Sequence, residues 1–380
     1  MRVLNVSALL DPVTGGGTAE RTIQLSRAFA RHGWETTALC IDTGFDRQAL
    51  RTRLGGARLE ALPCWNSRFL IPATGMSRLR SLVEAADIVH TCNHWTLLNL
   101  LVSREAKRAG RPWVVCPSGA LPMMDRSLIL KRIYNVLAGR SQVHDAAGWV
   151  AITARETQSF REYGVEPNEI TVIPNGIDPD DYLVADTGGF RRRHNLGAKP
   201  VILFLGRLAP VKGPDLLLEA FVRSESRFRD WLLVFAGPDG GELSALRNRA
   251  AALGERVRFL GHVALADKAS ALKTASLVVV PSRSEAMSLV ALEAGACGTP
   301  VLMTTECGFD DLPASGGGEL VAANYQALAE GMERMIGAAA ELAPRGAKLR
   351  EYILSRYTWN YMVERYQALF ESILKKPAAA

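Results

Sequence analysis

The sequence lacks cysteine pairs and long apolar runs, and each absence excludes a class of protein. Its six cysteines are scattered over 380 residues without a Cys-x-x-Cys pair, which argues against a disulfide framework and against a zinc site. No stretch reaches the ~18 uninterrupted apolar residues that span a membrane. Residues 1–7 form a short apolar run typical of a first strand, without the longer apolar region and cleavage site of a signal peptide. We therefore expect a cytoplasmic protein.

Two nucleotide-binding fingerprints are also absent. The chain contains neither Gly-x-Gly-x-x-Gly nor Gly-x-x-x-x-Gly-Lys-Ser/Thr, so it gives no support for a dinucleotide or P-loop site. A nicotinamide dehydrogenase is therefore a distant alternative. The formal net charge of +6 is modest for this length, and it is too diffuse to indicate a nucleic-acid partner.

The positive charge is nevertheless uneven along the chain. Between residues 47 and 80, seven arginines face one carboxylate, Glu60, and apolar residues such as Trp65 and Phe69 lie among them. This pattern is typical of a solvated helix face and a surface loop, and it also fits a patch on anionic lipid headgroups at the inner face of a membrane. The residues of such a peripheral contact would be Arg47, Arg51, Arg53, Arg58, Arg68, Arg78 and Arg80.

Strand and helix signals alternate along both halves of the chain, which favours parallel sheets with crossover helices. Near-continuous apolar runs are typical of strands that are covered on both faces. They predict strands at 3–7, 36–41, 87–90, 113–116 and 149–152, and again at 201–205, 231–236, 257–260, 277–280 and 300–303. Because one hydrophobic core rarely serves 380 residues, we expect two doubly wound α/β domains, 1–178 and 179–356, followed by a C-terminal helical segment, 357–380.

In open parallel sheets, ligands bind beyond the carboxyl ends of the strands, so the residues after each predicted strand are candidates. In the second half, Arg207 and Lys212 follow the strand 201–205. Two cations at this place can neutralise a diphosphate leaving group without a metal. The alternative is ordinary surface charge.

Two glutamates follow the strand 277–280 in the pattern Glu-x7-Glu. Glu285 would lie in the loop and Glu293 about two turns into the next helix. One carboxylate could accept hydrogen bonds from sugar hydroxyls and the other from a ribose. The amides at the start of this helix would point toward a phosphate, and they belong to Met287, Ser288 and Leu289.

The strand ends of the first half carry a second group of candidates. The triplet Gly15–Gly17 would let a phosphate approach the backbone at a helix N-terminus, although such a triplet is often only a flexible turn. His90 ends the strand 87–90 and His94 follows it, and Ser118 follows 113–116. For His90, a hydrogen-bonded core histidine is an equal alternative. If these strand ends face those of the second half, they enclose a cleft.

At this point the sequence resembles glycosyltransferase family 4, a retaining family with the GT-B fold, over almost its whole length. The shared motifs are the glycine triplet, Asp87-Ile-Val-His90, Val172–Asp178, Gly206-Arg-Leu208 with Lys212-Gly213, the Glu-x7-Glu block, and Tyr357-Thr-Trp359 before the last helix.

The resemblance implies two Rossmann-like domains that face each other across a deep cleft, with the acceptor on the first, the nucleotide-sugar donor on the second, and the C-terminal helix returning to the first. It implies that Arg207 and Lys212 hold the diphosphate and that Glu285 contacts the donor sugar. The other donor contacts would be Gly16, Gly17, Gly237, His262, Val263, Met287, Ser288, Leu289 and Glu293. The acceptor side would contain His90, His94, Ser118 and Gly119.

The implied reaction moves a hexose from a UDP- or GDP-linked sugar to a hydroxyl of a glycan or lipid-linked intermediate of cell-surface polysaccharide synthesis. Retention in this fold is explained by front-face attack, in which the leaving phosphate accepts the proton of the acceptor. No cofactor and no metal are implied, since Asp178-Pro179-Asp180 matches a metal-binding Asp-x-Asp by letter only.

Two departures from the family pattern affect specificity. The family's Glu-Gly-Phe-Gly-Leu is here Glu285-Ala-Met-Ser-Leu289, a bulkier loop that leaves the donor sugar open. Many relatives carry a histidine or arginine where this chain has Ser118. A non-catalytic binding subunit, a nucleotide-sugar epimerase or a sugar phosphorylase on the same fold remains an alternative.

Overall fold

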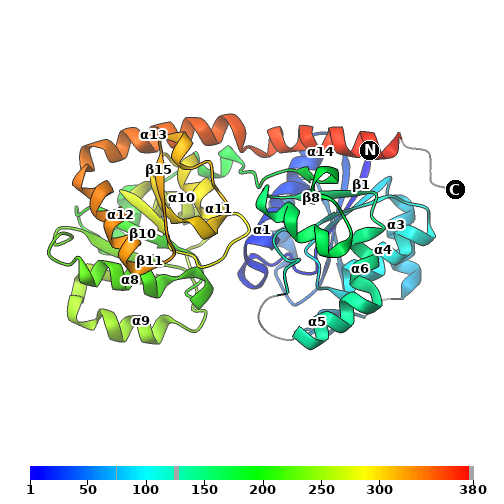
Figure 1. Cartoon of the computed structure of the whole chain (residues 1–380), viewed down its shortest axis with the longest axis horizontal. Helices are drawn as coiled ribbons and strands as arrows, with labels where there is room; N and C mark the ends of the chain where they lie inside the picture. Colours follow the sequence, from blue (N-terminus) through cyan, green and yellow to red (C-terminus); the bar gives the residue numbers. More distant parts are fainter. Residues whose placement is uncertain (74, 124–127, 376–380) are drawn as a thin grey trace. The chain divides into compact units, whose positions relative to one another are not determined.

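The computed structural model describes residues 1–73, 75–123 and 128–375, which form two compact units (Figure 1). One unit contains Met1–Gly176 and the C-terminal helix from Trp359, and the other is Ile177–Thr358. Among the described helices, none combines the length and the hydropathy that crossing a bilayer requires.

The first unit is built on a parallel sheet with the strand order β3-β2-β1-β6-β7-β8-β9. Its strands are β1 (Arg2–Val6), β2 (Glu35–Ile41), β3 (Arg58–Leu62), β6 (Ile88–Cys92), β7 (Trp113–Cys116), β8 (Gly148–Ala151) and β9 (Thr171–Val172). The α-helices are α1 (Pro12–Arg31), α2 (Arg47–Leu54), α3 (Met76–Ala85), α4 (Leu97–Arg108), α5 (Leu128–Tyr134) and α6 (Arg140–His144). A short antiparallel pair, β4 (Cys64–Asn66) and β5 (Ile71–Pro72), lies outside this sheet.

The second unit repeats this plan with the order β12-β11-β10-β13-β14-β15. Its strands are β10 (Val201–Leu205), β11 (Leu232–Ala236), β12 (Val257–Gly261), β13 (Leu277–Val280), β14 (Val301–Thr304) and β15 (Gly318–Val321). The helices are α7 (Thr187–Arg193), α8 (Pro214–Arg223), α9 (Leu243–Ala250), α10 (Leu265–Thr274), α11 (Leu289–Ala296), α12 (Tyr325–Gly337) and α13 (Ala339–Arg356). The two Rossmann-like sheets predicted from the alternating pattern are therefore confirmed.

The last helix, α14 (Trp359–Leu374), belongs to the first unit and packs on α1 (Figure 1). Buried side chains of α14 recur every three or four residues, from Trp359 to Ile373. The fully buried Arg21 of α1 donates hydrogen bonds to the Asn175 side chain at 2.9 Å and to the Tyr366 hydroxyl at 2.8 Å. These contacts join three distant parts of the chain in one core.

Candidate functional site

The strand order of the second unit reverses between β10 and β13, and the loops after these two strands carry the strongest candidates. A reversal point is where an open parallel sheet leaves a crevice at its carboxyl edge. Arg207 follows β10 directly, Lys212 ends the 3-10 turn Pro210–Lys212, and Glu285 lies in the loop after β13. The topology thus brings three residues that were separated in sequence to one edge of one sheet.

Lys212 and Glu285 form an ion pair, with 3.0 Å between Nζ and Oε1. The Ser282 hydroxyl also donates a hydrogen bond to the Glu285 carboxylate. The Lys212 side chain keeps about a third of its surface exposed, whereas that of Glu285 is mostly covered. The cation is therefore held at the surface by a carboxylate that is itself fixed in place.

The backbone of the two loops is held together tightly enough to fix this pair. Gly213 has φ +65°, and a Cβ there would lie 2.1 Å from the carbonyl oxygen of Pro281. The Arg283 amide donates to the Val211 carbonyl at 2.8 Å, and its guanidinium pairs with Asp215 at 2.6 Å. Only glycine allows the approach at position 213.

The loop from Glu285 to Ser288 rests on the turn that follows β14. The Glu285 amide donates to the backbone carbonyl of Glu306 at 2.8 Å, and the Ser288 amide donates to that of Cys307 at 2.9 Å. The Ser288 hydroxyl caps α11 by accepting from the Ala291 amide. We expected the Ser288 amide to face a phosphate, and the structure instead uses it inside the protein, because the turn after β14 packs against this loop.

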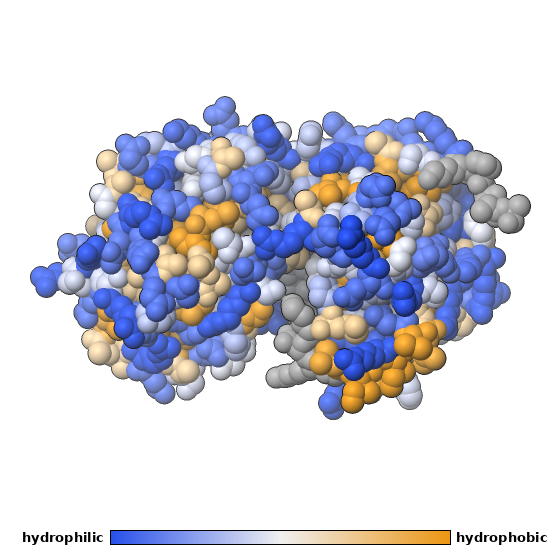
Figure 2. All heavy atoms as spheres, viewed as in Figure 1, coloured by the Kyte–Doolittle hydropathy of each residue, from blue (hydrophilic) through white to orange (hydrophobic). Residues whose placement is uncertain are grey.

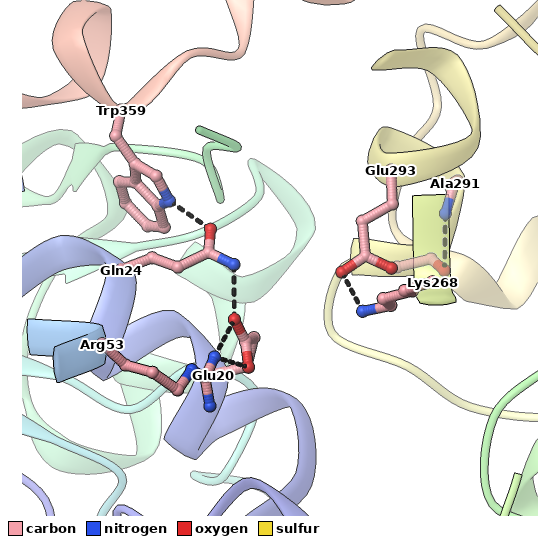
Figure 3. Close-up of polar contacts among 8 residues, drawn as sticks. Glu20, Gln24, Arg53, Lys268, Ala291, Glu293 and Trp359 are labelled. Carbon is pink, nitrogen blue, oxygen red and sulfur yellow. Dashed lines mark hydrogen bonds and ion pairs between the residues drawn. The ribbon is translucent and has the colours of Figure 1, made fainter. Parts of the chain in front are cut away.

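Glu293 lies in α11 with 1% of its surface exposed and forms an ion pair with Lys268 of α10 (Figure 3). A buried carboxylate needs such a partner, because its desolvation is costly. Sequence reasoning did not single out Lys268, which lies between Asp267 and Ala269 in α10 and belongs to no motif. Its distance of 25 residues from Glu293 leaves no periodic signal that could have found it.

The ends of β10, β11 and β12 lie side by side and hold the remaining donor candidates. Gly237 follows β11, and a Cβ there would lie 1.8 Å from the Gly206 carbonyl oxygen. The amide of Leu208, next to the exposed Arg207, donates to the backbone carbonyl of Pro238 at 2.9 Å. His262 follows β12 at the surface. Close backbone contacts and backbone hydrogen bonds therefore hold the loops that follow β10 and β11 together at one edge of the sheet.

In the first unit, the glycine triplet lies at the start of α1, near the point where the strand order reverses between β1 and β6. Gly16 has φ +57° and interrupts the helix there, which only glycine does at little cost. Gly17 is exposed and Gly16 half-buried. Both are placed where a ligand could approach their backbone.

His90 lies in the core and does not reach the surface. Its Nδ1–H donates a hydrogen bond to the side-chain oxygen of Asn5 at 2.8 Å. The ring packs against Phe29, Tyr366 and Phe370. Burial and the nearby Arg21 charge lower the pKa of His90 well below its usual value. Of the two alternatives for His90, an acceptor contact and a core histidine, the structure supports the core histidine, because α14 covers the strand on which His90 lies.

His94 is also buried, at the end of β6. Its Nε2 lies 3.2 Å from the Asn135 side chain, and its ring packs against Trp95, Tyr134 and Tyr163. Burial lowers the pKa of His94 to about 4, so the ring is neutral near pH 7. As for His90, a direct side-chain contact with an acceptor does not fit these surroundings.

After β7, Ser118 is half-buried and Gly119 is exposed. Both have positive φ, +53° and +84°, and the Gly119 amide is hydrogen-bonded to the carboxylate of Glu156. Burial raises the pKa of Glu156, and the same carboxylate accepts the Ile152 amide at 2.7 Å. Glu156, which the sequence did not single out, therefore fixes the loop that presents Ser118.

The arginine segment 47–80 does not present an unpaired basic face. Five of its seven arginines form ion pairs, as Figure 3 shows for Arg53 and Glu20. Arg47 pairs with Asp42, and Arg80 pairs with Glu105. Arg58 and Arg78 both pair with Glu60. Counting charges along the sequence missed these partners, since three of them lie outside the segment. Of the two interpretations of this arginine segment, a solvated surface fits the structure better than a patch on anionic lipid headgroups.

No cluster of three or more histidine, cysteine or carboxylate side chains suited to a metal occurs in 1–73, 75–123 and 128–375. The Asp-x-Asp sequence has a structural role instead, because the Asp178 side chain accepts the Asp180 amide at 3.2 Å and caps a short helical turn.

Known proteins match both units. The family model of glycosyl transferases group 1 matches residues 189–351, and that of the glycosyl transferase 4-like domain matches 16–176. The D-inositol 3-phosphate glycosyltransferase of Stackebrandtia nassauensis is 31% identical over 412 aligned positions, which cover 99% of this chain and 92% of that protein. The enzyme of the same name from Geodermatophilus obscurus is 34% identical over 258 positions, 64% of this chain and 57% of the relative.

Among solved structures, the Anabaena protein HepE in complex with UDP and glucose has a TM-score of 0.81 to this chain at 20% identity, covering 98% of this chain and 100% of the other. At this identity the likeness concerns the fold, which is GT-B. With the family models and the full-length relative, the chain belongs to the group 1 glycosyltransferases, family 4 of the GT-B fold.

Proposed function

We propose that this glycosyltransferase moves a hexose from a UDP- or GDP-linked sugar to a hydroxyl acceptor, with retention and without a metal. The observation that carries the proposal is the Lys212–Glu285 pair at the reversal point of the second sheet. It offers a cation for the leaving diphosphate beside a carboxylate that can accept sugar hydroxyls. Arg207, exposed at the end of β10, supplies a second cation.

The proposed roles follow from how each group is held. Lys212 moves from Glu285 toward the diphosphate as charge develops on the leaving group, and Glu285 stays in place through Ser282. Charge stabilisation by such preorganised groups is the largest contribution to many enzymatic rate enhancements. Glu293, fixed by Lys268, would accept the ribose hydroxyls.

Retention by front-face attack fits the first unit. The two histidines near the carboxyl end of β6 are buried and have lowered pKa values, so neither His90 nor His94 is placed as a surface general base. In the proposed reaction the leaving phosphate accepts the proton of the acceptor hydroxyl, and the protein contributes positioning and charge.

Two acceptor classes are compatible with this site. The relatives are named for D-inositol 3-phosphate, which favours a small phosphorylated polyol near Ser118 and Gly119. A lipid-linked or glycan acceptor is the second class, and the large apolar side chains that α5 exposes favour it. An epimerase would convert the donor with no acceptor present, whereas a non-catalytic subunit would turn over no donor with either acceptor.

Thermal unfolding with UDP, GDP, ADP and their sugar conjugates tests the donor site. A donor at one hundred times its Kd stabilises the folded state by about 2.7 kcal/mol. We expect one nucleotide series to do so for the wild type, and the effect to be lost in Lys212→Met and Glu293→Gln. Lys199→Met, a change at an exposed lysine of the same unit, should keep it. If no nucleotide raises the transition temperature, the donor proposal is wrong and a binding subunit becomes the better interpretation.

A further inference from the structure

The first unit exposes a group of large apolar side chains on consecutive helical turns. Ile129 is 74% exposed, Val136 83% and Leu137 73%. Leu128, Leu130 and Ile133 are exposed beside them, and we call these six residues the α5 face. Figure 2 shows the patch as a continuous hydrophobic surface over the region of α5. Soluble proteins seldom leave such a patch without a partner.

The opposite side of this helical segment is firmly attached to the unit. The chain runs from α5 through a π-helical stretch, Asn135–Gly139, into α6. The Tyr134 hydroxyl lies 2.7 Å from the Gln142 side chain and 3.1 Å from the His94 carbonyl oxygen. The side-chain amide of Asn135 donates to the Tyr163 hydroxyl at 3.0 Å. The inward side chains are polar and bonded, so the α5 face points outward because the other side is already occupied.

The charges of this segment are all of one sign. Residues 128–144 contain Lys131, Arg132 and Arg140, and no aspartate or glutamate. Arg132 and Arg140 are exposed next to the apolar side chains. An apolar helical face flanked by cations is complementary to anionic headgroups and to the acyl boundary below them.

We propose that the α5 face docks on an anionic lipid bilayer. Its apolar side chains would lie in the interface, and the neighbouring Arg132 and Arg140 would lie at the headgroups. The proposal does not depend on the transfer reaction, since it concerns a surface that needs no donor or acceptor. The docked segment also packs on residues that follow β6. Lys131 lies 5.3 Å over the Trp95 ring, and Asn135 contacts His94.

Co-sedimentation of the full chain with vesicles tests the proposal. We expect binding to phosphatidylcholine vesicles that contain phosphatidylglycerol, and little binding to phosphatidylcholine alone. The variant Ile129→Ser/Val136→Ser/Leu137→Ser should lower the partition coefficient by roughly tenfold or more. Arg132→Gln and Arg140→Gln should each lower it about fivefold. All these side chains are exposed, so circular dichroism and the melting temperature should stay unchanged.

A matched control removes exposed apolar side chains elsewhere. Leu183 and Val184 of the second unit are 60% and 86% exposed, and Leu183→Ser/Val184→Ser should bind vesicles as the wild type does. Trp65→Ser/Phe69→Ser examines the arginine segment in the same assay. The proposal is overturned if the wild type ignores anionic vesicles, if the triple variant binds like the wild type, or if only the Trp65/Phe69 variant loses binding. It is also overturned if sedimentation velocity shows a dimer that the triple variant converts to a monomer, because a second copy then covers the α5 face.

Discussion

Gly213 is the residue on which the geometry of the Lys212–Glu285 pair depends most. A Cβ at this position would meet the Pro281 carbonyl oxygen at 2.1 Å and would also sit at φ +65°. Gly213→Ala should therefore cost at least about 2 kcal/mol of unfolding free energy and should remove donor binding. Gly197→Ala is the control, because its φ is +56° and a Cβ there meets nothing within 4 Å. Equal losses in the two variants, measured by urea unfolding, would contradict the role of the close approach.

The buried His94 makes stability depend on pH in a defined direction. Its folded pKa is about 4 against an ordinary 6.5, so the unfolded chain binds the proton first as the pH falls. The contribution of the neutral ring is fully present above pH 6.5 and is lost progressively toward pH 4, by roughly 3 kcal/mol. His94→Gln should reduce the slope of the pH profile of urea unfolding in this range without abolishing it, because burial also holds the pKa of His90 well below its usual value. A wild-type slope in the His94 variant would refute this assignment.

At the scale of elements, the sequence was sufficient for most strands and insufficient for those with mixed composition. The apolar runs at 113–116, 201–205 and 277–280 match β7, β10 and β13 in both bounds, and the other seven predicted strands differ by one or two residues at an end. β3 was not predicted because Arg58-Leu-Glu-Ala-Leu62 is an edge strand with polar residues, and β15 because it begins within a glycine run.

The candidate site was also predictable only in part, because the sequence locates strand ends but not contacts between distant elements. Strand ends can be located from apolar runs, so the positions of Arg207, Lys212 and Glu285 beyond the ends of β10 and β13 could be predicted. Partners on other elements cannot be found in this way, which is why Lys268 and Glu156 were missed. The burial of His90 and His94 depends on α14, α5 and the π-helical turn folding over the sheet, and no local pattern carries that information.

The attachment of α14 gives a prediction for a single element. Tyr366→Phe removes the hydroxyl that Arg21 contacts at 2.8 Å and leaves a buried guanidinium with one partner fewer. This should destabilise the first unit by about 1–3 kcal/mol, and hydrogen exchange of the α14 amides should speed up. Leu374→Ala, at the exposed end of the same helix, should change stability by less than about 0.5 kcal/mol. Unchanged exchange in Tyr366→Phe would mean that packing alone holds the helix.

At the scale of the whole molecule, the chain crosses between the two units twice, so one unit is continuous in sequence and the other is not. The second unit begins at Ile177 and ends at Thr358, and these two residues pair in a parallel bridge, with the Ile177 amide bonded to the Tyr357 carbonyl at 2.8 Å. Its ends are therefore joined by its own hydrogen bonds. The first unit consists of residues 1–176 and a helix that is supplied from the far end of the chain.

This difference predicts that the fragments behave unequally. Residues 177–358, expressed alone, should unfold cooperatively, because their core and their ends are complete. Residues 1–176 alone should not, because α14 buries six large side chains on this unit and each contributes about 1.5–3 kcal/mol. The sum, of order 10 kcal/mol even as an upper estimate, is as large as the total stability of a typical domain. Adding a peptide of residues 359–375 to the 1–176 fragment should restore near-ultraviolet circular dichroism, and a cooperative transition of 1–176 without the peptide would show that α14 is dispensable.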